Sequence, residues 1–183
     1  MKIGKLGRDQ KGFSLIELVI VIALTGLITA AITTTVFQVF NMNTRTANRM
    51  TAVSQVQNAG KIVSEDILEA QSVNATGSPS FSLNLTWTDP ASGNRSTVIY
   101  TLVNMPTGAL QRLQRSVTVT PVEGAPTTTV FIVAEYIDPD PTKTSCEPAG
   151  VLQPGGVLTF TVTATVGDES ETRVYKVEPR PGS

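Results

Sequence analysis

The sequence predicts an α+β fold in which a long N-terminal α-helix packs on an antiparallel β-sheet. Two observations predict it. The 28 residues from Phe13 to Phe40 hold a single formal charge, and no proline follows until Pro79. Beyond Pro79 apolar and polar residues alternate with a period of two, and no helical pattern of ten or more residues separates these runs, which favours antiparallel strands. A chain of 183 residues allows one domain with an appendage.

The first element is a basic leader followed by a membrane segment. Residues 1–12 read MKIGKLGRDQKG, with four basic residues against Asp9. Residues 13–40 exceed the roughly 20 apolar residues that a bilayer-spanning helix needs. Because basic residues stay on the cytoplasmic side, we expect a single pass with a cytoplasmic N-terminus and an exported C-terminal part. A secretory signal has a shorter apolar run with small residues after it, whereas here Gly12 comes before the run. A retained anchor is predicted, and a plain signal anchor fits the same facts.

A carboxylate inside this apolar run, Glu17, is the detail that distinguishes a plain signal anchor from a more specific kind of membrane anchor. Glu17 would cost about 2.5–3.5 kcal/mol at the bilayer centre, and less near the interface, so it should have a compensating partner or should reach the headgroups. The surrounding residues, Lys11-Gly12-Phe13-Ser14-Leu15-Ile16-Glu17-Leu18, resemble the prepilin processing site of type IV pilins, type II secretion pseudopilins and competence pseudopilins. The resemblance covers about the first 40 residues.

The resemblance implies a set of site residues and partners. Prepilin peptidase would cut between Gly12 and Phe13 and methylate the new amine of Phe13. Glu17 lies four residues beyond Phe13, and we therefore expect both on the same helix face. In this family the glutamate is taken to pair with the amine of an adjacent subunit, which would set the register of assembly. The further partners implied are other pilin or pseudopilin subunits and an inner-membrane assembly platform.

The helix is predicted to continue beyond the membrane. Val53, Val56, Gly60, Val63, Ile67 and Ala70 recur at spacings of three and four on an otherwise polar segment, which is typical of a helix with one buried face. We expect this amphipathic part, residues 41–72, to pack on the protein's own sheet. The proline that many family members carry in the membrane helix is not present here. Thr33, Thr34 and Thr35 stand in that region, where their hydroxyls can bond back to the preceding turn.

The head is predicted to span residues 73–183, which with the helix gives the lollipop architecture of pilins. Residues 74–79 are interpreted as a turn-rich break. Six strands are expected, and Gly167-Asp168 favours a hairpin between the last two; their ranges are 81–87, 96–103, 109–115, 128–137, 157–166 and 171–178. The run Leu110-x-Arg112 followed by residues 133–137 resembles the C-terminal region of minor pilins and minor pseudopilins.

Composition narrows the classes of function. The chain has no histidine and one cysteine, Cys146, so it can form neither a histidine metal site, a Ser-His-Asp triad nor an internal disulfide. Its net charge is −1, so the chain lacks the excess of basic residues that is typical of proteins that bind nucleic acid, and nucleic acid is not expected as a partner. We predict no enzyme activity, no catalytic residues, no cofactor and no metal. The loop 138–156 carries three acids and leaves calcium open, although an EF-hand spacing is lacking.

The sequence therefore predicts a structural subunit of a type IV pilus or pseudopilus, and the C-terminal resemblance favours a minor one. It would lie in the cytoplasmic membrane as a precursor and at the cell surface or in the pilus after assembly. Secretion, competence and pilus machines all remain open. The alternative is an exported adhesin or DNA-uptake module that uses the pilin anchor only as a mount.

Overall fold

The computed structural model describes residues 12–76 and 81–180. The chain divides between Thr44 and Arg45 into two compact units, which we call the anchor unit and the head unit. One α-helix, α1 (Leu15–Glu69), contributes to both units and is 55 residues long. The absence of proline between Phe13 and Glu69 lets every turn of this helix keep its backbone hydrogen bond.

In the head unit the described residues form a nine-stranded sheet, and every pairing in it is antiparallel. The strands are β1 (Ser72–Thr76), β2 (Ser82–Thr88), β3 (Arg95–Asn104), β4 (Gln111–Thr120), β5 (Thr127–Ile137), β6 (Ser145–Glu147), β7 (Gly150–Val151), β8 (Leu158–Val166) and β9 (Glu169–Val177). Their order is β6-β8-β5-β4-β3-β2-β1-β7, with β9 paired to the other edge of β8. Short hairpins account for this order, because consecutive strands from β1 to β5 are neighbours.

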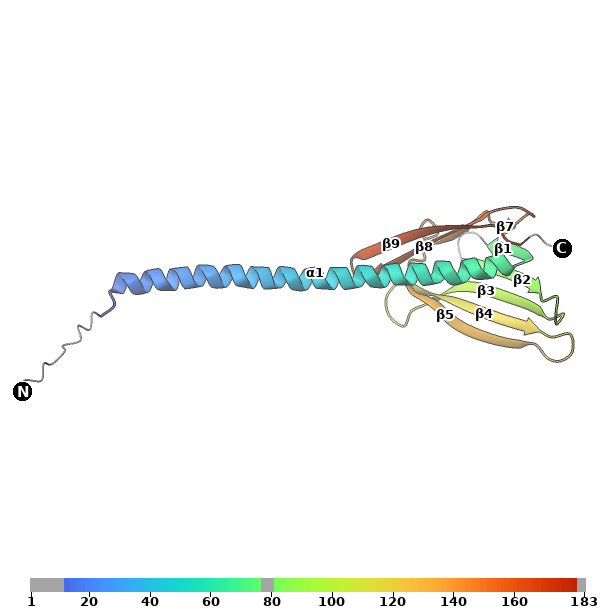
Figure 1. Cartoon of the computed structure of the whole chain (residues 1–183), viewed down its shortest axis with the longest axis horizontal. Coiled ribbons are helices and arrows are strands. Elements are labelled where there is room, and N and C mark those ends of the chain that lie inside the picture. The colour runs from blue at the N-terminus through green and yellow to red at the C-terminus, as the bar shows by residue number, and fades with distance from the viewer. Residues whose placement is uncertain (1–11, 77–80, 181–183) are drawn as a thin grey trace, which may run out of the picture. The chain divides into compact units, whose positions relative to one another are not determined.

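The head part of α1 supplies one wall of the core. Its buried residues are Ala52, Val56, Ala59, Gly60, Val63, Asp66 and Ile67. Figure 1 shows this part of the helix with β8 and β9 along one side and β3 to β5 along the other. Side-chain contacts agree with the picture, since Tyr175 of β9 reaches the carbonyl of Val56 and Arg115 of β4 reaches Asp66. The sheet therefore wraps around the helix, and the core lies between them.

Strand β5 is irregular, and this irregularity lets it cross from β4 to β8. Its register with β4 shifts twice after Ile132, which is the pattern of β-bulges. Consecutive residues Val133 and Ala134 are both buried, and Tyr136 has a φ of 60°. Helix side chains bond to the displaced backbone: Asn58 Nδ2 donates to Val133 O at 2.6 Å, and Glu135 N donates to Gln55 Oε1 at 2.8 Å.

The predicted fold class is confirmed, and so are the helix, the antiparallel sheet and the hairpin at Gly167-Asp168. The residues of α1 that were expected to face the sheet are buried except for Val53, which is half-buried; the buried ones are Val56, Gly60, Val63, Ile67 and Ala70. The expectation that the helix reaches Ser72 is wrong by three residues. The expected break at 74–79 is wrong over residues 74–76, which belong to β1; residues 77–80 lie outside the described part.

Two further corrections concern strand number and length. The expected strand 109–115 is observed as Gln111–Thr120, and the loop 138–156 contains β6 and β7, which were not predicted. Both short strands are held by partners that are distant in sequence: β6 pairs with β8, and β7 pairs with β1. Tertiary pairing, rather than a local pattern, therefore defines them.

Candidate functional site

The N-terminal end of α1 is where the sequence places the processing site. Gly12 and Phe13 precede the helix, and Phe13 is 82% exposed. Ser14 caps the helix, because its carbonyl accepts the bond from Leu18 N at 3.2 Å and its hydroxyl accepts one from Glu17 N at 3.3 Å. The segment Ser14-Leu15-Ile16-Glu17 thus has the spacing of a capping box. The Gly12–Phe13 bond therefore lies outside the helix, in a segment without regular secondary structure.

Glu17 lies in the first turn of α1 and is exposed. A carboxylate there is favoured by the partial positive charge of the helix N-terminus, by about 0.3–1 kcal/mol. The expectation that Phe13 and Glu17 share one helical face is not met, since the helix begins two residues after Phe13. Within the described residues, no basic side chain lies within ion-pair distance of Glu17.

The anchor unit presents an apolar surface along its whole helix. Large apolar side chains from Leu15 to Phe40 are 46–82% exposed, and this part of α1 is long and apolar enough to cross a membrane. Its threonine hydroxyls are satisfied internally: Thr33, Thr34 and Thr35 each donate to the carbonyl four residues earlier, at 2.8–3.0 Å. The predicted back-bonding is confirmed. This part of α1 therefore offers a lipid or a neighbouring helix almost no unsatisfied polar group apart from Glu17.

A buried polar cluster in the head was not predicted. Asp66 of α1 is 7% exposed and accepts two bonds from Arg115 of β4, Nε at 2.7 Å and Nη2 at 2.8 Å. The hydroxyl of Tyr100, on β3, donates to the same carboxylate. Burial, together with the neighbouring Asp66 carboxylate, raises the pKa of Tyr100, and the bonds to Asp66 raise the pKa of Arg115. The cluster joins the helix to two strands, and its groups are all engaged, so its role is structural.

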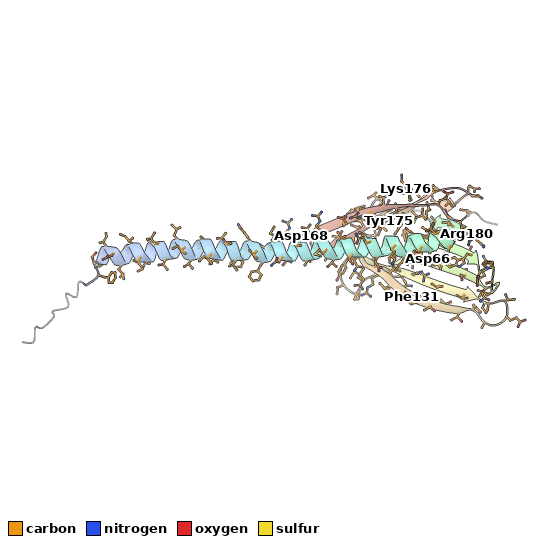
Figure 2. The ribbon with its side chains drawn as sticks, in the orientation of Figure 1. Asp66, Phe131, Asp168, Tyr175, Lys176 and Arg180 are labelled. Carbon is orange, nitrogen blue, oxygen red and sulfur yellow. The ribbon has the colours of Figure 1, made fainter. Side chains whose placement is uncertain are left out.

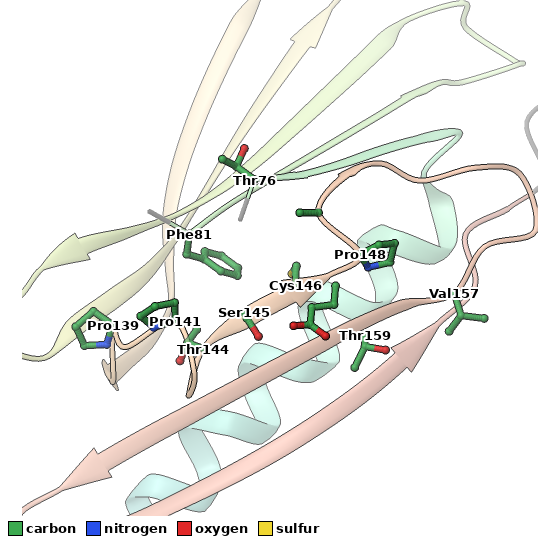
Figure 3. A pocket seen from close by; sticks show the side chains of 12 residues that line it. Thr76, Phe81, Pro139, Pro141, Thr144, Ser145, Cys146, Pro148, Val157 and Thr159 are labelled. Carbon is green, nitrogen blue, oxygen red and sulfur yellow. The ribbon is translucent and has the colours of Figure 1, made fainter. Parts of the chain in front are cut away.

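A hollow of about 590 Å³ lies beside β6 (Figure 3). Cys146 and Glu147 line it together with Thr76, Phe81 and several prolines. Cys146 is 4% exposed, and burial raises the pKa of its thiol to about 12. Since the thiolate is the reactive form, this cysteine is suited to packing and not to nucleophilic or redox chemistry at neutral pH.

Four further acidic residues of the head have partners. In the loop 138–156, Lys143 Nζ lies 2.7 Å from Asp138 Oδ2, and Asp140 accepts bonds from the backbone and hydroxyl of Thr142. Glu169 pairs with Arg45 and Glu171 with Arg173. No cluster of three potential metal ligands occurs among residues 12–76 and 81–180. A lysine beside Asp138 also takes the place that a cation would occupy.

The described residues thus form an α+β chain whose N-terminal helix is apolar enough to cross a membrane and is preceded by the exposed Phe13. Residues 7–33 match the family model described as "Prokaryotic N-terminal methylation motif". This motif is the signature of type IV pilins and pseudopilins, and it supports a pilin-type or pseudopilin-type subunit that is processed by prepilin peptidase. Comparison with curated proteins gave no match, and neither did comparison with solved structures.

Proposed function

We propose that this chain is a minor structural subunit of a type IV pilus or pseudopilus, cut between Gly12 and Phe13, N-methylated at Phe13 and assembled through its apolar helix. The methylation motif over residues 7–33 carries the proposal. The scissile bond would lie at the membrane surface, with the basic leader on the cytoplasmic side and the head exported. The assembly platform and sister subunits are the partners that this function requires.

Glu17 would then determine register by pairing with the N-terminal amine of a neighbouring subunit. Three observations support this role. Glu17 has no basic partner in the described part of the chain, its own Phe13 is not on its helical face, and it is the one charged residue between Phe13 and Thr44. In an apolar surrounding an unpaired carboxylate is costly, so a subunit whose Glu17 meets an amine is favoured over one that is displaced along the bundle.

Intact mass and N-terminal sequencing of the mature protein test the processing. We expect loss of residues 1–12 and a start at methylated Phe13. Replacing Gly12 with a bulky residue should leave the leader attached. A cut elsewhere, or a mature protein that retains the leader in cells that process other prepilins, contradicts the proposal.

Glu17→Gln and Glu17→Ala separate the pairing role from helix capping. Glutamine keeps the capping-box spacing but carries no charge, whereas alanine loses both. If Glu17 pairs with an amine, both variants should be processed yet fail to enter filaments. Glu17→Asp keeps the charge and should enter filaments in a reduced amount. If Glu17→Gln assembles like the wild type, the residue only caps the helix.

The alternative of an adhesin or DNA-uptake module gains no specific support from the head. Among the described residues that line the hollow beside β6, Glu147 is the single charged side chain. If the purified head protein binds a defined ligand through this hollow, that result would support the adhesin or DNA-uptake module.

A further inference from the structure

The side chain of Ser14 marks the point at which α1 begins. The helix starts at Leu15, so Ser14 occupies the N-cap position. Its carbonyl accepts bonds from Glu17 N at 3.1 Å and from Leu18 N at 3.2 Å, and its hydroxyl accepts a second bond from Glu17 N at 3.3 Å. Side-chain oxygens at this position satisfy N–H groups of the first turn that have no partner within a helix, and they thereby stabilise one particular start.

The cap depends on Ser14 and not on Glu17. In a complete capping box the Glu17 carboxylate would also accept a bond from Ser14 N. Between these two described residues that second bond is not formed, and the carboxylate is exposed. The hydroxyl of Ser14 is therefore the side-chain group that determines where the helix starts.

The residues before Ser14 would permit an earlier start. None of residues 9–13, DQKGF, is a proline, and Asp9 is a favourable N-cap residue more than one turn upstream. Unpaired N–H groups are costly beside an apolar phase, so a helix end without a cap gains by adding a turn. Gly12 opposes this extension, because glycine is a poor helix former. The cap at Ser14 and the glycine thus act in the same direction.

The peptide bond to be cut lies immediately before this cap. If the helix extended through Phe13, the carbonyl of Gly12 would accept a bond from Ile16 N and would be enclosed by the first turn. In the structure that bond is not formed, and Phe13 is 82% exposed. Proteolysis favours exposed segments whose backbone is free of such bonds. The position of the helix start therefore decides whether the Gly12–Phe13 bond is open to a peptidase.

We propose that Ser14 is a positioning residue for leader cleavage: its cap stops α1 before the Gly12–Phe13 bond and keeps that bond in the open form that prepilin peptidase binds. This role rests on the proposed processing at that bond and assigns Ser14 no part in bond breaking. The same cap leaves the new amine of Phe13 outside the helix, where it can turn toward Glu17 of a neighbouring subunit.

Kinetics of cleavage of the full-length precursor by purified prepilin peptidase test the role. Loss of a serine cap typically shifts the equilibrium of a helix start about fivefold. Because fewer precursors are then open, Ser14→Ala should raise KM by up to about fivefold, while kcat stays within about twofold of the wild type. Ser14→Gly is the matched control. Glycine lacks the hydroxyl but is an acceptable N-cap residue, so the KM of this variant should stay within about twofold of the wild type.

A second pair of variants keeps the size of the side chain constant. Threonine and valine have nearly the same shape, but only threonine can cap. Ser14→Thr should therefore be cut like the wild type, and Ser14→Val like Ser14→Ala. Amide hydrogen exchange in the full-length precursors gives an independent measurement. Residues 13–16 should exchange more slowly in Ser14→Ala than in the wild type, because the helix then extends over them.

Three results would overturn the role of Ser14. The first is a KM of Ser14→Ala equal to that of the wild type. The second is a Ser14→Gly precursor impaired as strongly as Ser14→Ala, since the peptidase would then recognise the hydroxyl itself. The third is a raised KM without slower exchange at residues 13–16. Each of these can occur while the wild type is cut between Gly12 and Phe13, whereas a wild-type precursor that is not cut there contradicts the proposed processing itself.

Discussion

Removal of the Asp66 carboxylate should destabilise the head more than any other single loss of charge. In the structure the carboxylate of Asp66, a residue that Figure 2 labels on α1, accepts two bonds from Arg115 and one from Tyr100. Asp66→Ala leaves the guanidinium of Arg115 without its partner; the loss of one partner from a fully buried pair typically costs about 3–5 kcal/mol. The Arg115 side chain is 21% exposed and can regain some water, so the lower end of that range applies. The hydroxyl of Tyr100 keeps only Ile62 O, at 3.4 Å, which adds about 1 kcal/mol.

We therefore expect Asp66→Ala to lower the free energy of unfolding by about 4 kcal/mol, measured by urea denaturation of residues 45–183 near pH 7. Asp66→Asn, which keeps the shape and one acceptor, should cost about half as much. The control is Glu169→Gln, which removes an exposed pair with Arg45 and should cost less than about 1 kcal/mol. If Asp66→Ala costs no more than this control, the cluster does not hold the helix to the sheet. A triple variant that combines Asp66→Leu, Arg115→Met and Tyr100→Phe should recover most of the loss, because a pair replaced by apolar groups leaves no buried charge.

Three further changes test the packing around α1. Gly60→Ala should cost about 2 kcal/mol or more, because an added Cβ would overlap the ring of Tyr175, yet in a Tyr175→Ala background the same change should stabilise by up to about 1 kcal/mol; a loss in both backgrounds refutes the clash. Asn58→Ala should cost about 1–3 kcal/mol in urea unfolding, because Val133 O loses its donor at the bulge, whereas Asn58→Asp should not restore it since a carboxylate cannot donate. Burial raises the pKa of Cys146 from 9.0 to about 12. Above pH 9 the unfolded thiol therefore releases a proton that the folded one keeps, and stability falls with rising pH by up to about tenfold in the folding constant per pH unit. Cys146→Ala should lack this component, and identical alkaline profiles for both proteins would show that the thiol is not shielded.

The elements that could be predicted from the sequence are those that a local pattern of apolar and polar residues specifies. The apolar run and the three-four spacing predicted α1, and strict alternation predicted β8, whose residues Leu158, Phe160, Val162 and Ala164 are all buried. Some local signal was also available at the misread places. Val117 and Val119 continue the alternation of β4, and Val73 and Ala75 alternate with polar residues in β1.

The remaining features depend on contacts between distant segments. Asp66 is indistinguishable in the sequence from the solvated acids beside it, Glu65 and Glu69, until Arg115 and Tyr100 arrive from β4 and β3. The bulges of β5 exist because the strand must pass from β4 to β8, and nothing in residues 133–137 requires two extra residues. Residues 127–132 of β5 pair with β4 alone among the described strands, and this could not be predicted either, because strand order determines which edge is open.

Two carboxylates on α1 differ in whether their partners lie within the subunit, and this difference separates folding from the assembly proposed for this helix. Asp66 lies in the head, where Tyr100 of β3 and Arg115 of β4 are its partners, so its charge is paired within the subunit. Glu17 lies in an otherwise uncharged stretch whose threonine hydroxyls bond back to their own helix, and the described residues offer it no cation. A buried charge can be exchanged together with its internal partners for packed apolar groups at little cost, but a charge whose partner comes from another molecule cannot. Variants of Asp66 should therefore alter the stability of the head and leave processing unchanged, whereas variants of Glu17 should leave the head's unfolding free energy unchanged and abolish assembly.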